Sequence, residues 1–489
     1  MTVLTGTDVT GLTVADLGRV HLIGVGGVGM SGIARILLAQ GVPVSGSDAR
    51  EWPALDALRA LGATIHIGHS PGNVAAVDTV VFSSAIKPGN AELDEARRLG
   101  LRLLHRSEAL AALMGGHRVL AIAGTNGKTT TTSMLTTVIQ ACGGDPSFAI
   151  GGELSEAGSN AHHGTGEYFV AEADESDRSF LLYRPHAAIV TNVEADHLET
   201  YGTLEAIEDA FAEFAGHVEP GGFLVCCADD PGAARLAEHA RAAGVTVHTY
   251  GERADADLRL ADLSSGAVGA QYRAVLDGVD LGLVTLPVPG RHIALNSAGA
   301  LLTAARLGLS TEAATAALST YGGVRRRFEL KGTAAGVRVY DDYAYHPTSM
   351  TVQLRTVREV AAPGRVVVAF QPYRLGRTTA FQAGIAAALG LADEVVVMEV
   401  YGPGEERAPG EGGVALTAAV PVDADHKVFV PSWSEVAAEV ARRSRAGDVV
   451  VTMGAPPIGM LGDEILEALD QAASGADAVA GPDGSEPAR

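Results

Sequence analysis

The stretch AGTNGKTTT, residues 123–131, decides how the middle of this chain folds. The apolar run VLAIA precedes it and a Thr-rich segment follows it, which predicts a strand, a glycine-rich loop and a helix. Gly124 and Gly127 let the loop backbone approach phosphate oxygens, and the N-terminus of the helix favours anions. Lys128 can reach the β- and γ-phosphates, and the Thr129 hydroxyl can bind Mg²⁺. The stretch therefore predicts a P-loop that holds a nucleoside triphosphate.

Acidic side chains and a histidine follow two further apolar strands in the same part of the chain. YFVAEADESD places Glu172, Asp174 and Glu175 just past one strand. AAIVTNVEADH places Asp196 and His197 just past another. Ligands of open parallel sheets bind at the carboxyl ends of the strands, so we expect these groups beside the P-loop. Carboxylates and a histidine there can hold Mg²⁺ ions that bridge ATP phosphates. The alternative interpretation is a solvated acidic loop.

A second glycine-rich turn, GVGGVGM at residues 24–30, lies near the N-terminus. Gly24, Gly26 and Gly29 fit the pattern GxGxxG between the expected strand RVHLIG and the expected helix SGIARILLAQ. Asp48 follows the next strand. Alone, this pattern indicates a dinucleotide fingerprint with Asp48 on a ribose hydroxyl. The same geometry serves any nucleotide diphosphate, including a UDP-sugar.

Charged side chains follow apolar strands in the last third of the chain as well. VYDDYAYHP carries Asp342, which could orient an adenosine or an amine. FQPYRLGRTT carries Arg374 and Arg377, which could neutralise a carboxylate or a developing phosphate. RRRF at 325–328 is interpreted either as a solvated basic cluster or as the source of an arginine on the γ-phosphate.

Composition narrows the class of protein. The 489 residues are 47% hydrophobic and 19% charged, which excludes a wholly disordered chain. The net charge of −22 opposes general binding to nucleic acid. Three cysteines make no disulfide framework, and we find neither a secretory signal nor an apolar run long enough for a membrane helix. We therefore expect a cytoplasmic protein with no membrane partner.

The order of short apolar runs, glycine-rich turns and helical stretches predicts an α/β fold of parallel sheets with crossover helices. Three blocks can be separated, at residues 18–115, 116–323 and 324–472. Within the second block, 255–288 alternates apolar and polar residues and is expected to be antiparallel. The small, polar, Pro/Gly-rich residues 473–489 are expected to form a disordered tail.

These motifs, in this order, resemble the Mur ligases of bacterial cell-wall synthesis over about residues 18–470. The resemblance rests on IGVGGVGMSGIA, SSAI, AGTNGKTTT, EADESD, NVEADH, GRHIALN, RRRF, DDYAYHP and FQPYR. It implies a Rossmann-like UDP-sugar-binding domain, a central P-loop ATPase domain and a C-terminal Rossmann-like domain that binds the amino acid and ATP.

The resemblance also implies a reaction. ATP would phosphorylate the lactyl carboxylate of UDP-N-acetylmuramic acid, and the amine of L-alanine would then attack the acyl phosphate. The implied cofactors are ATP and Mg²⁺, the implied partners are those two small molecules, and the implied assembly is a monomer or weak homodimer. Such an enzyme would work in the synthesis of peptidoglycan precursors.

By matching positions, the resemblance implies roles for individual residues. The implied catalytic residues are Lys128, Glu172, His197, Arg327 and Asp342, and the implied metal ligands are Thr129, Glu172 and His197. The implied ATP contacts are Gly124, Thr125, Asn126, Gly127, Lys128, Thr129, Thr130, Asn296, Arg327 and Asp342. The implied UDP-sugar contacts are Gly26, Gly27, Val28, Gly29, Asp48, His69, Ser84 and Arg106. The implied amino-acid contacts are Tyr345, Arg374 and Arg377.

Several positions depart from the family's usual pattern. Asn126 stands for a usual His, and Ile293 for a usual Asn. Tyr345 and Tyr373 stand for usual histidines, and Ala-Pro-Pro at 455–457 for Ala-Gly-Asp. The last three changes fall in the domain that selects the amine. Two alternatives therefore stay open, a related ligase with another amine and a non-catalytic sensor of UDP-muramyl ligands. A nicotinamide-dependent oxidoreductase built on the first block would leave the P-loop without a role.

Overall fold

Three β-sheets organise the part of the chain that the structure, a computed structural model, describes. The described residues are 11–152, 160–402, 405, 408, 410–455 and 457–479. They group into two compact units, and each is described by itself. The first unit holds the chain up to Leu263, Gln271–Leu286 and Ile293–Gly322, and the second holds Ser264–Ala270, Pro287–His292 and the chain from Gly323 onward.

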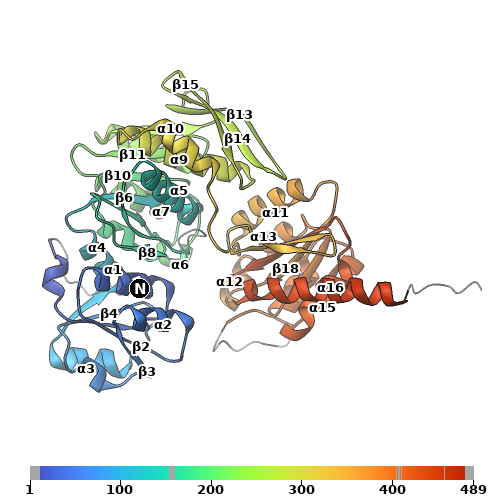
Figure 1. The fold of residues 1–489 in the computed structure, drawn as a ribbon, viewed down its shortest axis with the longest axis horizontal. Helices are drawn as coiled ribbons and strands as arrows, with labels where there is room; N and C mark the ends of the chain where they lie inside the picture. The colour runs from blue at the N-terminus through green and yellow to red at the C-terminus, as the bar shows by residue number, and fades with distance from the viewer. Residues whose placement is uncertain are drawn as a thin grey trace, which may run out of the picture. The chain divides into compact units, whose positions relative to one another are not determined.

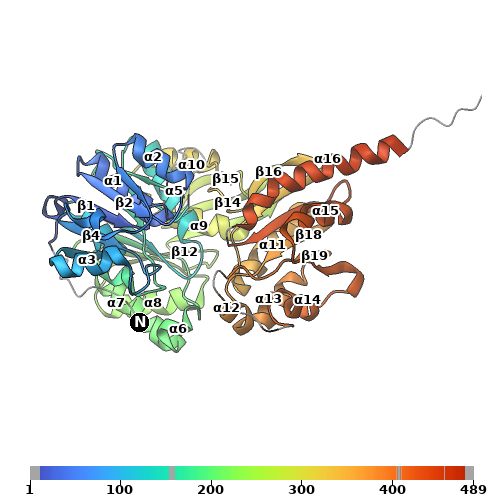
Figure 2. The same ribbon diagram turned by 90° about the horizontal axis from the view of Figure 1, so that it is seen from below.

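The first sheet of unit 1 has five parallel strands in the order β3-β2-β1-β4-β5. The chain runs outward from β1 in both directions, so right-handed crossovers place α1 and α2 on one face and α3 on the other (Figure 2). The GVGGVG turn follows the central strand β1 at this switch point. The strands are β1 (Val20–Ile23), β2 (Val44–Asp48), β3 (Thr64–Ile67), β4 (Thr79–Phe82) and β5 (Arg102–His105), and the helices are α1 (Val28–Ala39), α2 (Pro53–Ala60), α3 (Ala91–Leu99) and α4 (Arg106–Leu113).

The second sheet has ten strands in the order β15-β14-β13-β12-β11-β10-β6-β9-β7-β8. The P-loop strand β6 lies between β10 and β9 and runs parallel to both, which brings the three loops after these strands to one edge. Two-residue connections join β13, β14 and β15, and such connections allow only antiparallel neighbours. The strands are β6 (Arg118–Ala123), β7 (Ser147–Ala149), β8 (Ala161–His162), β9 (Tyr168–Glu172), β10 (Ala187–Val190), β11 (Phe223–Cys227), β12 (Val247–Gly251), β13 (Leu258–Gly266), β14 (Gly269–Leu276) and β15 (Val279–Leu286).

Helices that follow the strands of the second sheet pack around it. Helix α5 packs against α10, while α7 and α8 pack together and α8 lies on β11 and β12. Helix α5 begins directly at the P-loop lysine, so the end of the loop and the start of the helix coincide. The helices are α5 (Lys128–Ala141), α6 (Leu198–Tyr201), α7 (Leu204–Gly216), α8 (Pro231–Ala242), α9 (Arg291–Arg306) and α10 (Thr311–Ser319).

Unit 2 is a six-stranded sheet in the order β16-β17-β21-β18-β19-β20, parallel except for the β16–β17 pair. Helices α11 and α13 cover one face and α15 and α16 the other (Figure 1). The strands are β16 (Glu329–Ala334), β17 (Val337–Asp342), β18 (Val366–Gln371), β19 (Glu394–Val397), β20 (Lys427–Phe429) and β21 (Val449–Gly454), and the helices are α11 (Pro347–Ala361), α12 (Leu375–Ala380), α13 (Gln382–Leu389), α14 (Gly413–Ala419), α15 (Trp433–Arg443) and α16 (Leu461–Val479).

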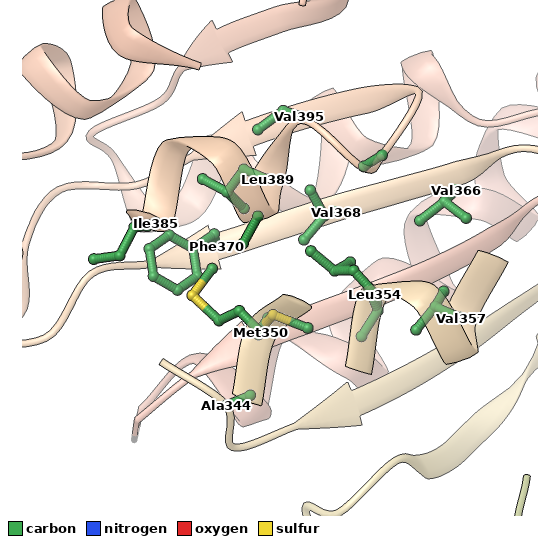
Figure 3. Packing of buried hydrophobic residues seen from close by; sticks show 14 of the residues in the cluster. Ala344, Met350, Leu354, Val357, Val366, Val368, Phe370, Ile385, Leu389 and Val395 are labelled. Atoms are coloured by element: carbon green, nitrogen blue, oxygen red, sulfur yellow. The ribbon is translucent and has the colours of Figure 1, made fainter. Parts of the chain in front are cut away.

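The core of unit 2 follows from the alternation of side chains along β18. Val368 and Phe370 face α11 and α13, where they meet Met350 and Leu354 (Figure 3). Val367 and Ala369, which alternate with them, belong to the cluster under α15 and α16. Because successive side chains of a strand point to opposite faces, a strand covered on both faces is apolar throughout, as VVVAF is.

The predicted tail begins too early. Helix α16 continues through residues 473–479, so the prediction of disorder from residue 473 is wrong for that segment. Small, polar composition predicts disorder, but alanine also has a high helix propensity, and this segment continues helix α16. Residues 480–489 and Pro456 lie outside the described residues. Among the described helices, none has the length and apolar character to span a membrane.

Candidate active site

The P-loop is a left-handed turn between β6 and α5. Gly124 has φ +128° and Gly127 has φ +87°, conformations that residues with a Cβ rarely adopt. Both glycines also touch neighbours closely. A Cβ on Gly124 would overlap the hydroxyl of Thr191, and one on Gly127 would lie 2.8 Å from Oδ1 of Asn296. The loop therefore requires glycine at both positions, and Asn296 of α9 lies against it.

The segment after β10 holds the P-loop in shape. The Asn126 amide donates to Oδ1 of Asn192 at 2.8 Å, and the Asn192 side chain donates back to the Asn126 carbonyl at 2.9 Å. The Thr191 hydroxyl donates to the same carbonyl at 2.6 Å, and the Glu194 amide donates to the Thr125 hydroxyl at 3.0 Å. These bonds fix the loop backbone, and the N-terminus of α5 that follows the loop favours an anion.

Lys128 is paired with Glu175, one of the carboxylates expected beside the P-loop. Its Nζ donates to Oε2 of Glu175 at 2.7 Å and to the Gly124 carbonyl at 2.6 Å. The side chains of Lys128 and Glu175 are only 17% and 4% exposed. Burial by itself would lower the pKa of Lys128, but the charges of Glu175 and Asp174 outweigh it and raise that pKa. The lysine is therefore a fixed positive charge at the loop.

A cavity of about 190 Å³ joins the P-loop to the first glycine-rich turn within unit 1. Lys128 and Glu172 line it from the second sheet, and Gly29 and Arg106 line it from the first. Oε1 of Glu172 accepts the Gly151 amide at 2.6 Å, which fixes the carboxylate at the end of β9. The cavity thus brings the expected phosphate lysine and an expected metal ligand together with the expected diphosphate loop.

His197 lies beside the same lysine–glutamate pair. Its Nε2 is 4.0 Å from Oε1 of Glu175 and 3.7 Å from Oδ2 of Asp196. His197 itself has φ +52° at the start of α6, and the Tyr201 hydroxyl at the other end of this turn donates to the Glu175 carbonyl at 2.6 Å. His197 and Lys128 therefore share Glu175 as a neighbour.

The donor groups suit Mg²⁺ better than a metal held wholly by protein. Among the described residues, no three His, Cys, Asp or Glu side chains converge on one point. Mg²⁺ commonly takes one or two carboxylates and completes its shell with water and substrate phosphates. A Glu172 carboxylate beside a P-loop lysine and threonine fits that pattern.

In the first glycine-rich turn, Asp48 supports the loop. Its Oδ2 accepts the Gly26 amide at 3.0 Å, and its Oδ1 accepts the Trp52 indole N–H at 3.0 Å. A Cβ on Gly26 would lie 2.7 Å from the Trp52 ring, so only glycine fits. Gly27 is the cap of α1, and Val28, the first residue of that helix, is exposed.

The other expected UDP-sugar residues lie at the ends of β3, β4 and β5. The Ser84 hydroxyl lies 3.1 Å from Nε2 of His105, and Arg106 follows as the first residue of α4. The Asn160 side chain, beside β8, donates to the Val28 carbonyl at 2.7 Å and so ties the second sheet to the first turn. The sequence showed no signal for this link.

His69 belongs to a buried polar network around Glu92. Its Nδ1 is 3.0 Å from Oε2 of Glu92, and the Ser47 hydroxyl donates to that oxygen at 2.6 Å. Asn73 donates to Oε1 at 2.6 Å, and Nε2 of buried His21 is 3.6 Å away. Burial alone would raise the pKa of Glu92, but His21, Ser47 and Asn73 outweigh it and lower the pKa to about 2.

We expect Glu92→Gln to destabilise the protein at neutral pH. A carboxyl whose pKa falls from 4.5 to about 2 on folding contributes about 3 kcal/mol above pH 4.5. That contribution declines as the pH falls from about 4.5 toward 2. The difference in urea unfolding between wild type and variant should therefore be large at pH 7 and shrink below pH 4.5. Asp94→Asn, on the exposed side of the same helix, is the control and should change little. A difference independent of pH would contradict the assignment.

Unit 2 places Asp342 and Arg327 at the end of β17 and in the segment before β16. Oδ2 of Asp342 accepts the Phe328 amide and Oδ1 accepts the Ala344 amide, both at 2.8 Å. Burial raises the pKa of Asp342 to about 6, with the nearby Arg327 charge opposing the rise. Arg326, in contrast, is bound to Asp341 at 2.8 Å and supports the local fold.

The residues expected to contact the amino acid form an aromatic–arginine cluster in unit 2. The rings of Tyr345 and Tyr373 have centroids 5.7 Å apart. The Arg377 guanidinium lies 5.1 Å from the Tyr345 ring centre, and that of Arg374 lies 5.5 Å from the Tyr373 ring centre. Tyr343 lies 5.8 Å from Tyr345. The two tyrosines that depart from the family pattern are therefore direct neighbours of the two arginines.

Comparison with known proteins gives a consistent result. Three family models match: "Mur ligase family, catalytic domain" at residues 19–118, "Mur ligase middle domain" at 122–304 and "Mur ligase, glutamate ligase domain" at 326–456. The chain is 62% identical over 464 residues to a UDP-N-acetylmuramate–L-alanine ligase of Salinispora arenicola, covering 95% of this chain and 91% of that protein. It is 53% identical over 459 residues to the enzyme of the same name from Acidothermus cellulolyticus, covering 94% and 96%.

Solved structures agree with these matches. A crystal structure of the UDP-N-acetylmuramate–alanine ligase from Thermotoga maritima superposes with a TM-score of 0.78 at 28% identity and covers 93% of this chain and 99% of that one. A murein peptide ligase from Psychrobacter arcticus superposes with a TM-score of 0.69 at 26% identity, with the same coverage. The predicted α/β fold class is confirmed.

Proposed function

The chain belongs to the Mur ligase family, and from that premise we propose that it joins L-alanine to the lactyl carboxylate of UDP-N-acetylmuramic acid with ATP as the energy source. Identities of 50% to 62% over nearly the whole chain, to ligases named for that reaction, support L-alanine over another amine. The observation that carries the proposal is the shared cavity, because it is lined by the P-loop lysine and Glu172 on one side and by Gly29 on the other.

Each domain has a part in this proposal. The first sheet, within residues 18–115, would bind the UDP-sugar through Gly26, Gly27 and Gly29. Residues 116–323 would bind ATP through the P-loop, with Asn296 at the adenine. The last domain, residues 324–472, would bring Arg327, Asp342 and the tyrosine–arginine cluster to ATP and the amino acid.

In this reaction the protein mainly positions the reactants and stabilises the negative charge of the phosphates. A carboxylate is a poor electrophile, and phosphorylation converts one of its oxygens into a leaving group that the amine can displace. Lys128 would hold the β- and γ-phosphates, and the N–H groups at the start of α5 would stabilise charge on the transferring phosphoryl. Mg²⁺, when bound by Glu172, Thr129 and His197, would neutralise phosphate charge.

One assay tests the proposal. Purified protein with ATP, Mg²⁺, UDP-N-acetylmuramic acid and L-alanine should form a product heavier by one alanine residue, together with ADP and phosphate. Offered a panel of amino acids, the enzyme should prefer L-alanine, and omission of either the sugar acid or the amino acid should suppress amide formation. If another amino acid is preferred, that amino acid and not L-alanine is the amine substrate. ATP hydrolysis that does not depend on the UDP-sugar acid or on the amino acid would contradict the proposal that the protein is a ligase. The absence of any ATP hydrolysis would contradict it as well.

A further inference from the structure

An ion pair crosses the cavity between the two nucleotide-binding loops of unit 1. Arg106, the first residue of α4, lies 3.1 Å from Asp174, which follows β9, measured from Nη2 to Oδ2. Both side chains are about one-third exposed, at 35% and 38%, so water and ligands can reach them. The pair therefore joins the sheet expected to bind the UDP-sugar to the sheet expected to bind ATP.

Arg106 lies next to Gly29 in the first glycine-rich turn as well as next to Asp174. Its Nη1 lies 3.2 Å from the point where a Cβ on Gly29 would stand. Of the cavity lining that the structure describes, Arg106 and Lys128 are the two basic residues, and Lys128 is bound to Glu175 and to loop carbonyls. Arg106 is therefore the cation that an anionic group entering beside Gly29 would meet.

Asp174 faces the other site. It lies two residues from Glu172 in the same cavity lining, and its charge acts on Lys128. A divalent cation bound with ATP at Glu172 would attract the Asp174 carboxylate and weaken its hold on Arg106. The released guanidinium would then bind the anion of the sugar substrate through two parallel N–H···O hydrogen bonds.

We propose that Asp174 is a positioning residue that holds Arg106 until Mg–ATP binds, and that the exchange of Arg106 from Asp174 to the anionic UDP-sugar couples the two binding sites. This inference rests on the proposed function. By linkage, Mg–ATP and the UDP-sugar must then strengthen each other's binding by the same factor. Asp174 acts through Arg106, whereas Arg106 itself contacts the substrate.

If Asp174 restrains Arg106, removal of the Asp174 charge should strengthen binding of the sugar substrate. Asp174→Asn keeps the oxygen that accepts the Ser176 amide at 3.0 Å and removes the charge that restrains Arg106. In the absence of ATP and Mg²⁺, this variant should bind UDP-N-acetylmuramic acid about two- to fivefold more tightly than wild type, the range expected of a partly exposed ion pair. Arg106→Ala should weaken that binding about tenfold or more.

Titration calorimetry with UDP-N-acetylmuramic acid, with and without Mg²⁺ and a non-hydrolysable ATP analogue, measures both effects. The analogue should tighten sugar binding in wild type and add little in Asp174→Asn. The gain from Asp174→Asn should vanish in the Arg106→Ala background. Asp94→Asn, which breaks an exposed Arg97 pair elsewhere in unit 1, is the matched control and should bind as wild type does. Asp174→Ala replaces the Asn variant if that fails to fold.

The outcomes separate the two proposals. Unchanged or weaker sugar binding by Asp174→Asn, with wild type binding normally, overturns the exchange and leaves the ligase proposal standing. A wild-type protein that does not bind UDP-N-acetylmuramic acid overturns the proposed function and the exchange with it.

Discussion

Lys128→Ala should lower the rate of amide formation by about 100- to 1,000-fold, the usual loss when one fixed charge at a phosphoryl-transfer site is removed. Lys128 is held at the P-loop by the Gly124 carbonyl and by Glu175, and burial by loop and helix keeps water from replacing it. Because its charge is fixed before ATP arrives, its loss affects the transition state and not only binding. Single-turnover measurement with saturating ATP would separate the two effects.

The same substitution leaves Glu175 buried without its lysine, which we expect to cost about 3–5 kcal/mol of stability. The double variant Lys128→Ala/Glu175→Gln removes that unpaired charge and is the control. It should recover most of the melting temperature while amide formation stays low. A folded Lys128→Ala protein with wild-type turnover would contradict the assignment of the P-loop, and recovery of turnover in the double variant would show that stability alone was lost.

Gly124→Ala should be the most damaging glycine substitution in the loop. An alanine there would adopt a φ of +128° and its Cβ would overlap the Thr191 hydroxyl, with the Thr191 amide 3.0 Å away. Relief requires the loop to separate from the segment after β10, which breaks the hydrogen bonds that shape it. We expect ATP affinity to fall about 100-fold or more, since the backbone donors lose their arrangement around phosphate.

The matched control is Gly143→Ala, just beyond the other end of α5. Gly143 also has a positive φ, +85°, but a Cβ there meets nothing within 4 Å. It should cost about 1–2 kcal/mol of stability for the left-handed conformation and leave ATP affinity unchanged. Calorimetry with an ATP analogue and a melting curve distinguish the two variants. Equal losses of affinity would show that positive φ, and not the contact with Thr191, explains the effect.

Local sequence patterns predicted the strands, loops and helices of the site because each motif contains the residues that determine its own conformation. AGTNGKTTT combines an apolar strand, two glycines and a lysine, and the structure places β6, the left-handed loop and α5 on those residues. Parallel strands bring their carboxyl ends together, so the loops of β9 and β10 could be expected beside the P-loop without knowledge of the structure. Their order on either side of β6 confirms that expectation.

Partners distant in sequence could not be predicted in this way. The pairing of Lys128 with Glu175, 47 residues away, and of Arg106 with Asp174, 68 residues away, depends on side-chain directions after packing. Several carboxylates follow β9, and no spacing rule distinguishes them. The same limit applies to Asp48, which has the position of a ribose ligand but is engaged by Gly26 and Trp52.

From the sequence alone came the parallel α/β architecture, the positions of the two glycine-rich loops and the class of chemistry, because periodicity, glycine content and residue type act over a few neighbouring positions. Tertiary structure alone decided which carboxylate holds which cation, which glycines are too crowded for a side chain, and that one cavity joins the two loops. Those features arise from the close packing of segments far apart in the chain, where differences of an ångström determine whether two groups bond.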